Sequence, residues 1–259
     1  MRIKASVIAA AIEEFAPGHI QEKWDNSGFT IGGPDKDVTS ALLSLDCTPA
    51  VIEEAISKGV DMIITHHPLI FSPLKRIAGG SVVEKMVESA IKGGIVIYSA
   101  HTNADKVLPG VSGLMAEKMG LRDVKILDPE DENTGLGVMG ILNEPLSAMD
   151  LVSLVKKKFG LSTVRHSRLI DGLIEKVALC GGSGGSLIEK SVAAGVQVLI
   201  TGDLSYHRFL CEDGFMVIDT GHFESETEVL TLIKDILSKK IPNFEVRISD
   251  NNNNLIYYH

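Results

Sequence analysis

Short runs of valine, isoleucine and leucine recur along the chain, and the segments between them have helical patterns. The apolar runs are residues 42–45, 60–64, 95–97, 177–179, 196–200 and 215–218, and the helical patterns are residues 50–58, 82–92, 110–119, 187–194 and 225–238. Continuous apolar runs are typical of strands in a sheet that helices cover on both faces. The sequence therefore predicts an α/β fold, with a short edge strand at residues 255–258.

The chain also contains an internal similarity. Residues 52–65 and 188–201 align at an offset of 136, and six of the fourteen positions are identical. Two further segments match in the same order on either side of this one. These matches predict a duplicated α/β unit. We expect two similar lobes, residues 1–127 and residues 128–259, with an approximate boundary and a cleft between them.

The net charge is −9 and the pI is near 5.4. Nucleic acids and anionic membranes bind positively charged surfaces, so we expect neither as a partner. The sequence has no apolar run of about 18 residues, which argues against a membrane span. The three cysteines are far apart and form no disulfide or metal motif. Reduced thiols are typical of a cytoplasmic protein.

Two adjacent histidines, His66 and His67, come at the end of the apolar run at residues 60–64. In open α/β sheets, functional groups gather where strands end, at the carboxyl edge of the sheet. A histidine pair at this place is a pair of metal ligands in one interpretation, and polar loop chemistry or a cap in the other. The pair alone leaves both interpretations open.

Each predicted lobe also has a histidine that a carboxylate follows four residues later, after a predicted strand. His101 and Asp105 form this pair in the first lobe, and His222 and Glu226 form it in the second. On a helix, His222 and Glu226 would share one face. Taken singly, such pairs also fit turn residues or helix capping. Their recurrence at equivalent strand ends favours metal binding.

Imidazole nitrogens and carboxylate oxygens are ligands of Zn, Mn and Fe. The candidate ligands are His66, His67, Asp105, His222 and Glu226. This set is larger than one ion requires, and a carboxylate can bridge two ions. The sequence therefore predicts two divalent metal ions in the cleft between the lobes, and the ligand types suit Zn, Mn and Fe alike.

Further residues are expected near this cleft. Asp203 and His207 lie where the internal similarity places the counterpart of the adjacent histidines, and we expect them to orient a ligand or to contact substrate. His101 is expected to orient a ligand or to move a proton. The glycine-rich residues 181–185 follow a strand, and they fit a tight turn or, alternatively, a turn that binds phosphate.

Five motifs, taken in order, resemble one known family. They are WDNSGFTIG (residues 24–32), THHPLIFSPLKRI (65–77), HTNAD (101–105), TGDLSYH (201–207) and GHFESE (221–226). The set resembles the NGG-interacting factor 3-like family, whose members are often named GTP cyclohydrolase 1 type 2. The resemblance extends over most of the chain, from about Trp24 to Glu226.

The resemblance implies a toroidal homohexamer of two-lobed α/β subunits, each with a dinuclear metal site that faces a central cavity. The family's ligand pattern falls on the same residues as above, which are His66, His67, Asp105, His222 and Glu226. Some relatives carry a domain inserted in the middle. The corresponding segment of this chain is too short to hold one, so we expect the minimal form.

The sequence thus predicts a dinuclear metal-dependent hydrolase. In its most specific form, a metal-bound hydroxide opens the guanine ring of GTP, and His101 or His207 moves the proton. Lys75 and Arg76 are candidates to contact the triphosphate, and they fit a solvated loop equally well. The alternative is a protein that binds or delivers metal without turnover.

Overall fold

The computed structural model describes residues 1–258. Over that range the chain forms two compact units, one of Met1–Ala104 together with the chain from Val229 onward, and one of Asp105–Glu228. The predicted lobes, residues 1–127 and 128–259, divide the chain elsewhere. The C-terminal part belongs to the first unit because strand Glu245–Ile248 pairs with strand Ser40–Ser44. None of the helices in residues 1–258 is both long and apolar enough to cross a membrane.

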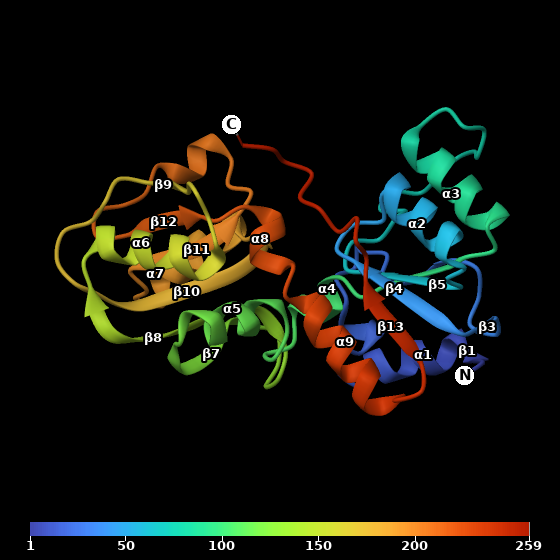
Figure 1. Ribbon diagram of the computed structural model, residues 1–259. Coiled ribbons are helices and arrows are strands. Elements are labelled where there is room, and N and C mark those ends of the chain that lie inside the picture. The colour runs from blue at the N-terminus through green and yellow to red at the C-terminus, as the bar shows by residue number, and fades with distance from the viewer. Residues whose placement is uncertain (259) are drawn as a thin grey trace. The chain divides into compact units, whose positions relative to one another are not determined.

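The first unit is built on a sheet with the strand order β13-β4-β5-β6-β2 (Figure 1). Its strands are β2 (Gly28–Ile31), β4 (Ser40–Ser44), β5 (Met62–Thr65), β6 (Val96–Ser99) and β13 (Glu245–Ile248). Strands β13, β4, β5 and β6 are parallel, and β2 is antiparallel to β6. A separate antiparallel pair joins β1 (Ile3–Lys4) to β3 (Asp37–Val38). The residues that follow β4, β5 and β6 therefore share one edge of the sheet.

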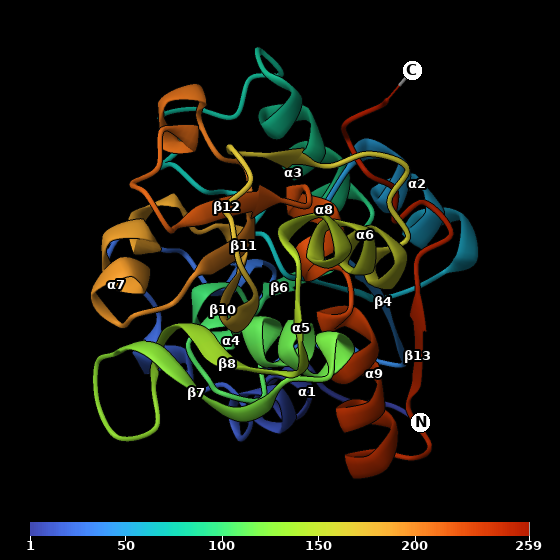
Figure 2. The same ribbon diagram turned by 90° about the vertical axis from the view of Figure 1, so that its left-hand side faces the viewer.

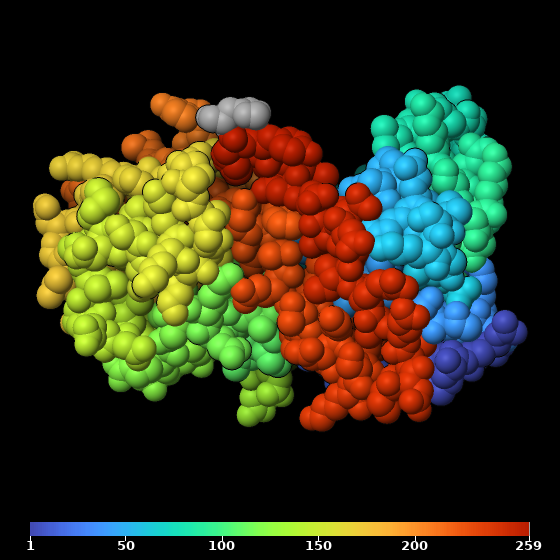
Figure 3. Space-filling view, in the orientation of Figure 1, coloured from blue at the N-terminus to red at the C-terminus, as the bar shows by residue number. Residues whose placement is uncertain are grey.

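Helices cover both faces of this sheet. They are α1 (Ala5–Glu13), α2 (Pro49–Lys58), α3 (Val82–Lys92) and α9 (Val229–Lys240). Helices α2 and α3 pack on the face that carries Ile63 and Ile97, while α1 and α9 cover the other face (Figure 1). In the space-filling view, the red residues of the C-terminal part lie against the blue residues of this unit (Figure 3). Burial from both sides explains the continuous apolar runs.

Local signals set the ends of these helices. The hydroxyl of Thr48 accepts a hydrogen bond from the backbone N–H of Val51 at the start of α2, and Ser81 caps Glu84 in the same way in α3. Helix α2 ends at Gly59, whose φ of 65° lies in the left-handed region that glycine adopts without strain. Capping hydroxyls and a terminal glycine thus define the ends of helices whose positions the apolar pattern predicts only approximately.

The second unit has a sheet with the strand order β7-β8-β10-β11-β12-β9. Its strands are β7 (Arg122–Pro129), β8 (Gly135–Leu146), β9 (Arg165–His166), β10 (Ile174–Ser183), β11 (Val198–Gly202) and β12 (Met216–Asp219). Strands β10, β11 and β12 are parallel, and the others are antiparallel to their neighbours. Helices α5 (Val111–Met119) and α6 (Ala148–Phe159) cover one face, as Figure 2 shows, and α7 (Ile188–Ala193) packs on the other.

The structure confirms a mixed α/β fold with two main sheets in residues 1–258. Both sheets contain three adjacent parallel strands with an antiparallel strand beside them, in the orders β4-β5-β6-β2 and β10-β11-β12-β9. The duplication itself stays a prediction, as does a cleft between lobes. The edge strand predicted at residues 255–258 is wrong, since these residues belong to no strand. The helix predicted at residues 225–238 is divided between α8 (His222–Glu226) and α9.

Glu54 on α2 anchors the segment that follows β13. Its buried carboxylate accepts hydrogen bonds from the side chain of Ser249, from the backbone and side chain of Asn251, and from Lys58, at distances of 2.5 to 3.2 Å. Burial alone would raise the pKa of Glu54, but these hydrogen bonds outweigh burial and lower the pKa from 4.5 to about 2. The carboxylate therefore holds the C-terminal segment onto the first unit.

We expect Glu54→Gln to lower the free energy of unfolding by about 2 kcal/mol at neutral pH, because the charged acceptor is lost. The pKa of Glu54 is depressed in the folded state, so its stabilisation is complete above pH 4.5 and is lost as the pH falls toward 2. Denaturant unfolding at several pH values should show the gap between the two proteins closing on acidification. Glu53→Gln, at an exposed neighbour, is the control; a gap independent of pH would contradict the prediction.

Candidate metal centre

His66 and His67 directly follow β5, where backbone hydrogen bonds fix both residues. The N–H of His66 donates to the carbonyl of Ser44, and the N–H of His67 donates to the carbonyl of Leu45, at 3.3 and 2.9 Å. The hydroxyl of Thr65 donates to the carbonyl of His67 at 2.7 Å. These bonds extend the β4–β5 pairing past the strand end, so the two imidazoles sit at the carboxyl edge of the sheet.

His101 joins these two residues from the end of β6. The ring centroids of His66, His67 and His101 lie 5.1 to 5.5 Å from one another. Each ring offers a nitrogen within 4.8 Å of a nitrogen of the other two, a spacing that allows them to share a metal ion. His66 is fully buried, whereas His67 and His101 are partly exposed. The structure thus brings together three histidines from two neighbouring strand ends.

Each of these imidazoles is held through its Nδ1 atom. Nδ1 of His66 donates to the carbonyl of Ala100 at 2.8 Å. Nδ1 of His67 lies 2.8 Å from the carboxylate of Asp46, and Nδ1 of His101 lies 2.7 Å from that of Asp25. Oxygen acceptors fix the proton on Nδ1, so the lone pair of each neutral imidazole is on Nε2.

Asp25 is a buried centre of hydrogen bonding in this unit. Besides His101, it accepts hydrogen bonds from the hydroxyl of Ser27, from the backbone N–H of Asn26 and from both the N–H and the hydroxyl of Thr102. Burial alone would raise the pKa of Asp25, but the bonds from His101 and Thr102 outweigh it and hold the pKa well below its usual range. Asp25 is therefore a fixed carboxylate that orients His101.

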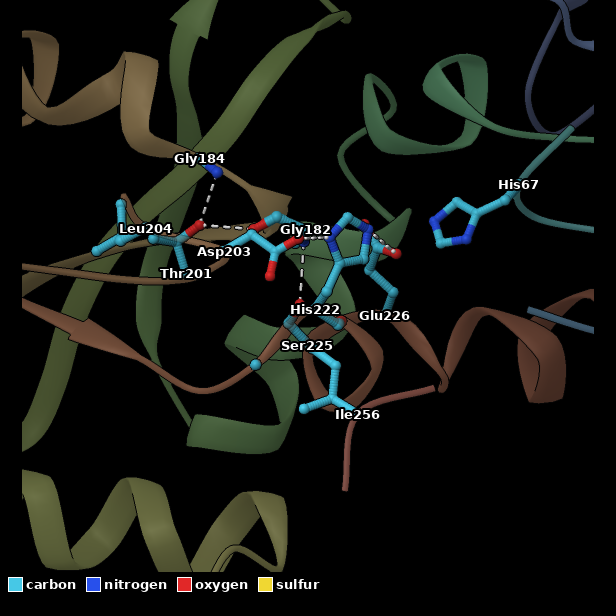
Figure 4. Close-up of polar contacts among 12 residues, drawn as sticks. His67, Gly182, Gly184, Thr201, Asp203, Leu204, His222, Ser225, Glu226 and Ile256 are labelled. Atoms are coloured by element: carbon cyan, nitrogen blue, oxygen red, sulfur yellow. Dashed lines mark hydrogen bonds and ion pairs between the residues drawn. The ribbon is translucent and has the colours of Figure 1, made fainter. Parts of the chain in front are cut away.

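The second unit has a fourth imidazole with the same support. His222 begins α8, and its Nδ1 lies 2.9 Å from the carboxylate of Asp203, which follows β11. Its Nε2 lies 3.0 Å from the carboxylate of Glu226, one helical turn later. Figure 4 shows both carboxylates approaching the His222 ring. Glu226 and Asp105, the last residue of α4 (Thr102–Asp105), offer oxygens within 4.8 Å of each other.

The donor chemistry of these residues fits a divalent transition-metal ion. In all four histidines an oxygen acceptor at 2.7 to 2.9 Å holds Nδ1, which leaves the lone pair on Nε2 to ligate a metal ion or to accept a proton. Paired carboxylates, here Asp105 and Glu226, are the oxygen ligands that accompany imidazole at zinc, manganese and iron. Each unit thus has a group of side chains that could ligate metal, the three histidines in the first unit and Asp105, His222 and Glu226 in the second.

Asp203 adopts an unusual backbone conformation. Its φ of 50° lies in the left-handed region, which an aspartate tolerates only at some cost, while its side chain orients His222. We expect Asp203→Gly to weaken metal binding about 10- to 100-fold, because the acceptor of Nδ1 is lost. The same change relieves the backbone strain, so the melting temperature should not fall.

A chelator-competition titration and a thermal melt measure these two effects separately. Asp203→Asn, which keeps an oxygen acceptor and tolerates the same φ, is the matched control and should retain most of the affinity. Equal metal affinity in the glycine and asparagine variants would show that the contact to His222 has no role in binding.

The glycine-rich residues 181–185 are the end of β10 and the start of a 3-10 turn, Gly185–Leu187, and they support His222 and Glu226. The N–H of Gly182 donates to the hydroxyl of Ser225 on α8 at 3.0 Å, and that of Gly184 donates to the hydroxyl of Thr201 at 2.9 Å (Figure 4). These two amides donate within the protein, and phosphate binding by this segment stays a prediction. Gly182 has a φ of 58°, and its lack of a side chain allows α8 to approach β10.

The remaining predicted residue, His207, lies outside these groups of side chains. His207 belongs to the exposed turn Tyr206–Phe209 and packs edge-on against Tyr206. Within residues 1–258 it belongs to none of the His/Asp/Glu clusters, so its catalytic role stays a prediction. Asp46 and Asp25 were not predicted. Asp46 follows β4 at the same sheet edge as the histidines, a position that could have indicated it.

Comparison with known proteins identifies the family. The model of the Duf34/NIF3 (NGG1p interacting factor 3) family matches residues 3–254. The chain belongs to this family. A Clostridium perfringens member named GTP cyclohydrolase 1 type 2 homolog is 34% identical over 244 residues, which cover 92% of this chain and 93% of that protein.

Two further proteins are similar to the chain over most of its length. NIF3-like protein 1 of Drosophila melanogaster is 32% identical, over 92% of this chain and 83% of that protein. A crystal structure of a hypothetical Staphylococcus aureus protein is 27% identical and has a TM-score of 0.90, with 99% of each chain covered. The resemblance inferred from five motifs thus extends over nearly the whole chain and over both sheets.

Proposed function

We propose that this NIF3-family protein is a metal-dependent hydrolase. Its ligands would be His66, His67, Asp105, His222 and Glu226. The observation that carries the proposal is the common support of the imidazoles, each with Nδ1 held by an oxygen so that Nε2 can ligate. The name GTP cyclohydrolase 1 type 2 homolog, which relatives bear, supports a nucleotide as substrate.

The residues of the chain would divide the work as follows. Bound divalent ions would supply a Lewis acid and lower the pKa of a bound water. His101, held at Nδ1 by Asp25, would take and return a proton at Nε2, as a general base and then a general acid. Lys75 and Arg76 are both exposed after β5, and they would contact the phosphates of GTP. Two metal ions for each subunit and a homohexamer are part of this proposal.

The test is hydrolysis of GTP by protein loaded with Zn, Mn or Fe. Opening of the guanine ring changes the purine absorbance, and its completion releases formate. We expect metal-dependent turnover that His67→Ala abolishes and that His166→Ala, a change at an exposed strand residue, leaves intact. Turnover that is equal in the two variants would exclude the proposed site.

One observation favours a second candidate, a protein that binds or delivers metal without turnover. A catalyst, unlike a carrier, would place Asp203, His207 and Asn103 around the ions, and of these Asp203 contacts His222. His207 instead packs against Tyr206, and the side chain of Asn103 bonds to the carbonyl of Ala16 and to Ser27. This candidate predicts exchangeable metal, and no hydrolysis of nucleotides, phosphoesters or cyclic amides with any of the three metals.

A further inference from the structure

Two aromatic rings beside the histidine cluster are exposed to solvent. Trp24 is 59% exposed and Phe71 is 55% exposed, although both are large and apolar. Their ring centroids lie 5.7 Å apart with a 54° angle between the planes. His101 contacts both rings, at 6.2 and 6.3 Å, with its plane at 73° to each. The three rings form one cluster at the carboxyl edge of the first sheet.

The backbone around both rings is held in place. The side-chain amide of Asn26 donates to the carbonyl of Ile70 at 2.6 Å, which ties the loop of Trp24 to the loop of Phe71. Asp25, which directly follows Trp24, accepts hydrogen bonds from Ser27 and Thr102. The loops that carry both rings are therefore held by polar contacts of neighbouring residues, and the rings contact each other and His101.

Exposed aromatic rings at defined positions are suited to binding another flat ring. Burying such rings would stabilise the fold, so leaving them exposed forgoes that gain. The 54° tilt means that Trp24 and Phe71 do not stack on each other, so neither ring covers the face of its neighbour. Flat, preorganised rings bind other flat rings with little loss of conformational entropy.

We infer that Trp24 and Phe71 bind a planar heteroaromatic ring, of the nucleobase kind, and place it next to His101. This inference deepens the proposed function, on which it rests for the ligand being a substrate. It names the ring, rather than the sugar or the phosphates, as the part of the substrate that this surface selects. The binding itself requires no metal ion.

The chain reports this binding directly, because Trp24 is its single tryptophan. We would titrate guanosine monophosphate into the full-length protein, with and without bound metal, and excite at the red edge of the indole band, where purines do not absorb. We expect saturable quenching by guanosine monophosphate and none by ribose 5-phosphate. Absence of saturable quenching, or equal quenching by ribose 5-phosphate, would overturn the inference.

Substitutions at Phe71 test whether stacking is the cause. Phe71→Ala should weaken the binding of guanosine monophosphate about tenfold, as expected for the loss of one ring–base contact. Phe71→Leu, which keeps the apolar surface but not the flat ring, should weaken it nearly as much. Leu173→Ala, at an apolar residue of similar exposure in the second unit, is the control. Unchanged binding in both Phe71 variants would overturn the inference.

The two proposals can fail separately. If guanosine monophosphate binds through Trp24 and Phe71 but no metal supports hydrolysis, the ring-binding surface stands and the hydrolase proposal fails. If hydrolysis requires His67 but Phe71→Ala leaves both the KM for GTP and the quenching unchanged, the hydrolase stands and this inference fails. The Trp24→Ala variant has no tryptophan fluorescence, so its binding of guanosine monophosphate is measured by calorimetry and should be weakened as in Phe71→Ala.

Discussion

Replacing His67 by alanine is expected to weaken metal binding by at least about a hundredfold. Loss of a residue that only orients a ligand costs 10- to 100-fold, and loss of the ligand itself should cost more. His67 is partly exposed and its ring lies at the end of β5, so its removal should change the free energy of unfolding little. Elemental analysis of the purified protein and competition with a chromogenic chelator measure the effect.

Two control variants make this result specific. His166→Ala removes an imidazole whose Nδ1 contacts only its neighbour's carbonyl, that of Ser167, among the contacts found in residues 1–258, and it should keep the full metal content. Asp46→Asn keeps an oxygen near Nδ1 of His67 and should have an intermediate affinity. Full metal content in His67→Ala would remove this histidine from the site.

Gly182→Ala is expected to destabilise the second unit by about 3 kcal/mol and to displace the side chain of Glu226. A Cβ at this position would overlap Oε1 of Glu226 and would approach Cε1 of His222 at 3.2 Å. The φ of 58° adds backbone strain for any residue with a side chain. Thermal and denaturant unfolding measure the loss of stability, and chelator competition measures the accompanying loss of metal affinity.

Gly172→Ala separates the two causes. Gly172 has a φ of 86°, and a Cβ there would meet no atom within 4 Å, so this variant suffers the backbone strain without the overlap. We expect it to lose about 1 kcal/mol and to keep its metal affinity. If the two alanine variants were equally stable and bound metal equally well, close packing of α8 on Gly182 would have no importance.

The sequence predicted the parts of this fold that depend on local pattern. Continuous apolar runs located β4, β5, β6, β10, β11 and β12, because strands buried on both faces need apolar residues at every position. The histidines were found for a related reason, since polar residues at the end of such a strand are conspicuous. His66, His67 and His101 are in fact together at one sheet edge.

Features that depend on distant partners could not be predicted in this way. Strand β7 lacks a continuous apolar run because it is largely exposed and carries charged residues, and glycines interrupt the apolar residues of β8. The return of β13 to the first unit rests on its pairing with β4 and on contacts of Glu54 with Ser249 and Asn251, which are 195 and 197 residues away. Asp25 bonds to a histidine 76 residues away, so nothing in its own neighbourhood indicates that role. Asp46 bonds to a histidine 21 residues away, and only its place after β4 could have indicated it.

The ligating nitrogen of the histidines is the central claim, and anomalous diffraction from crystals soaked in a zinc, manganese or iron salt tests it most directly. We predict an anomalous peak about 2.0–2.2 Å from Nε2 of His66, His67 or His222, with Nδ1 still bonded to its oxygen acceptor. A peak beside Nδ1, or a fully soaked crystal with no peak at any of these imidazoles, would contradict the account.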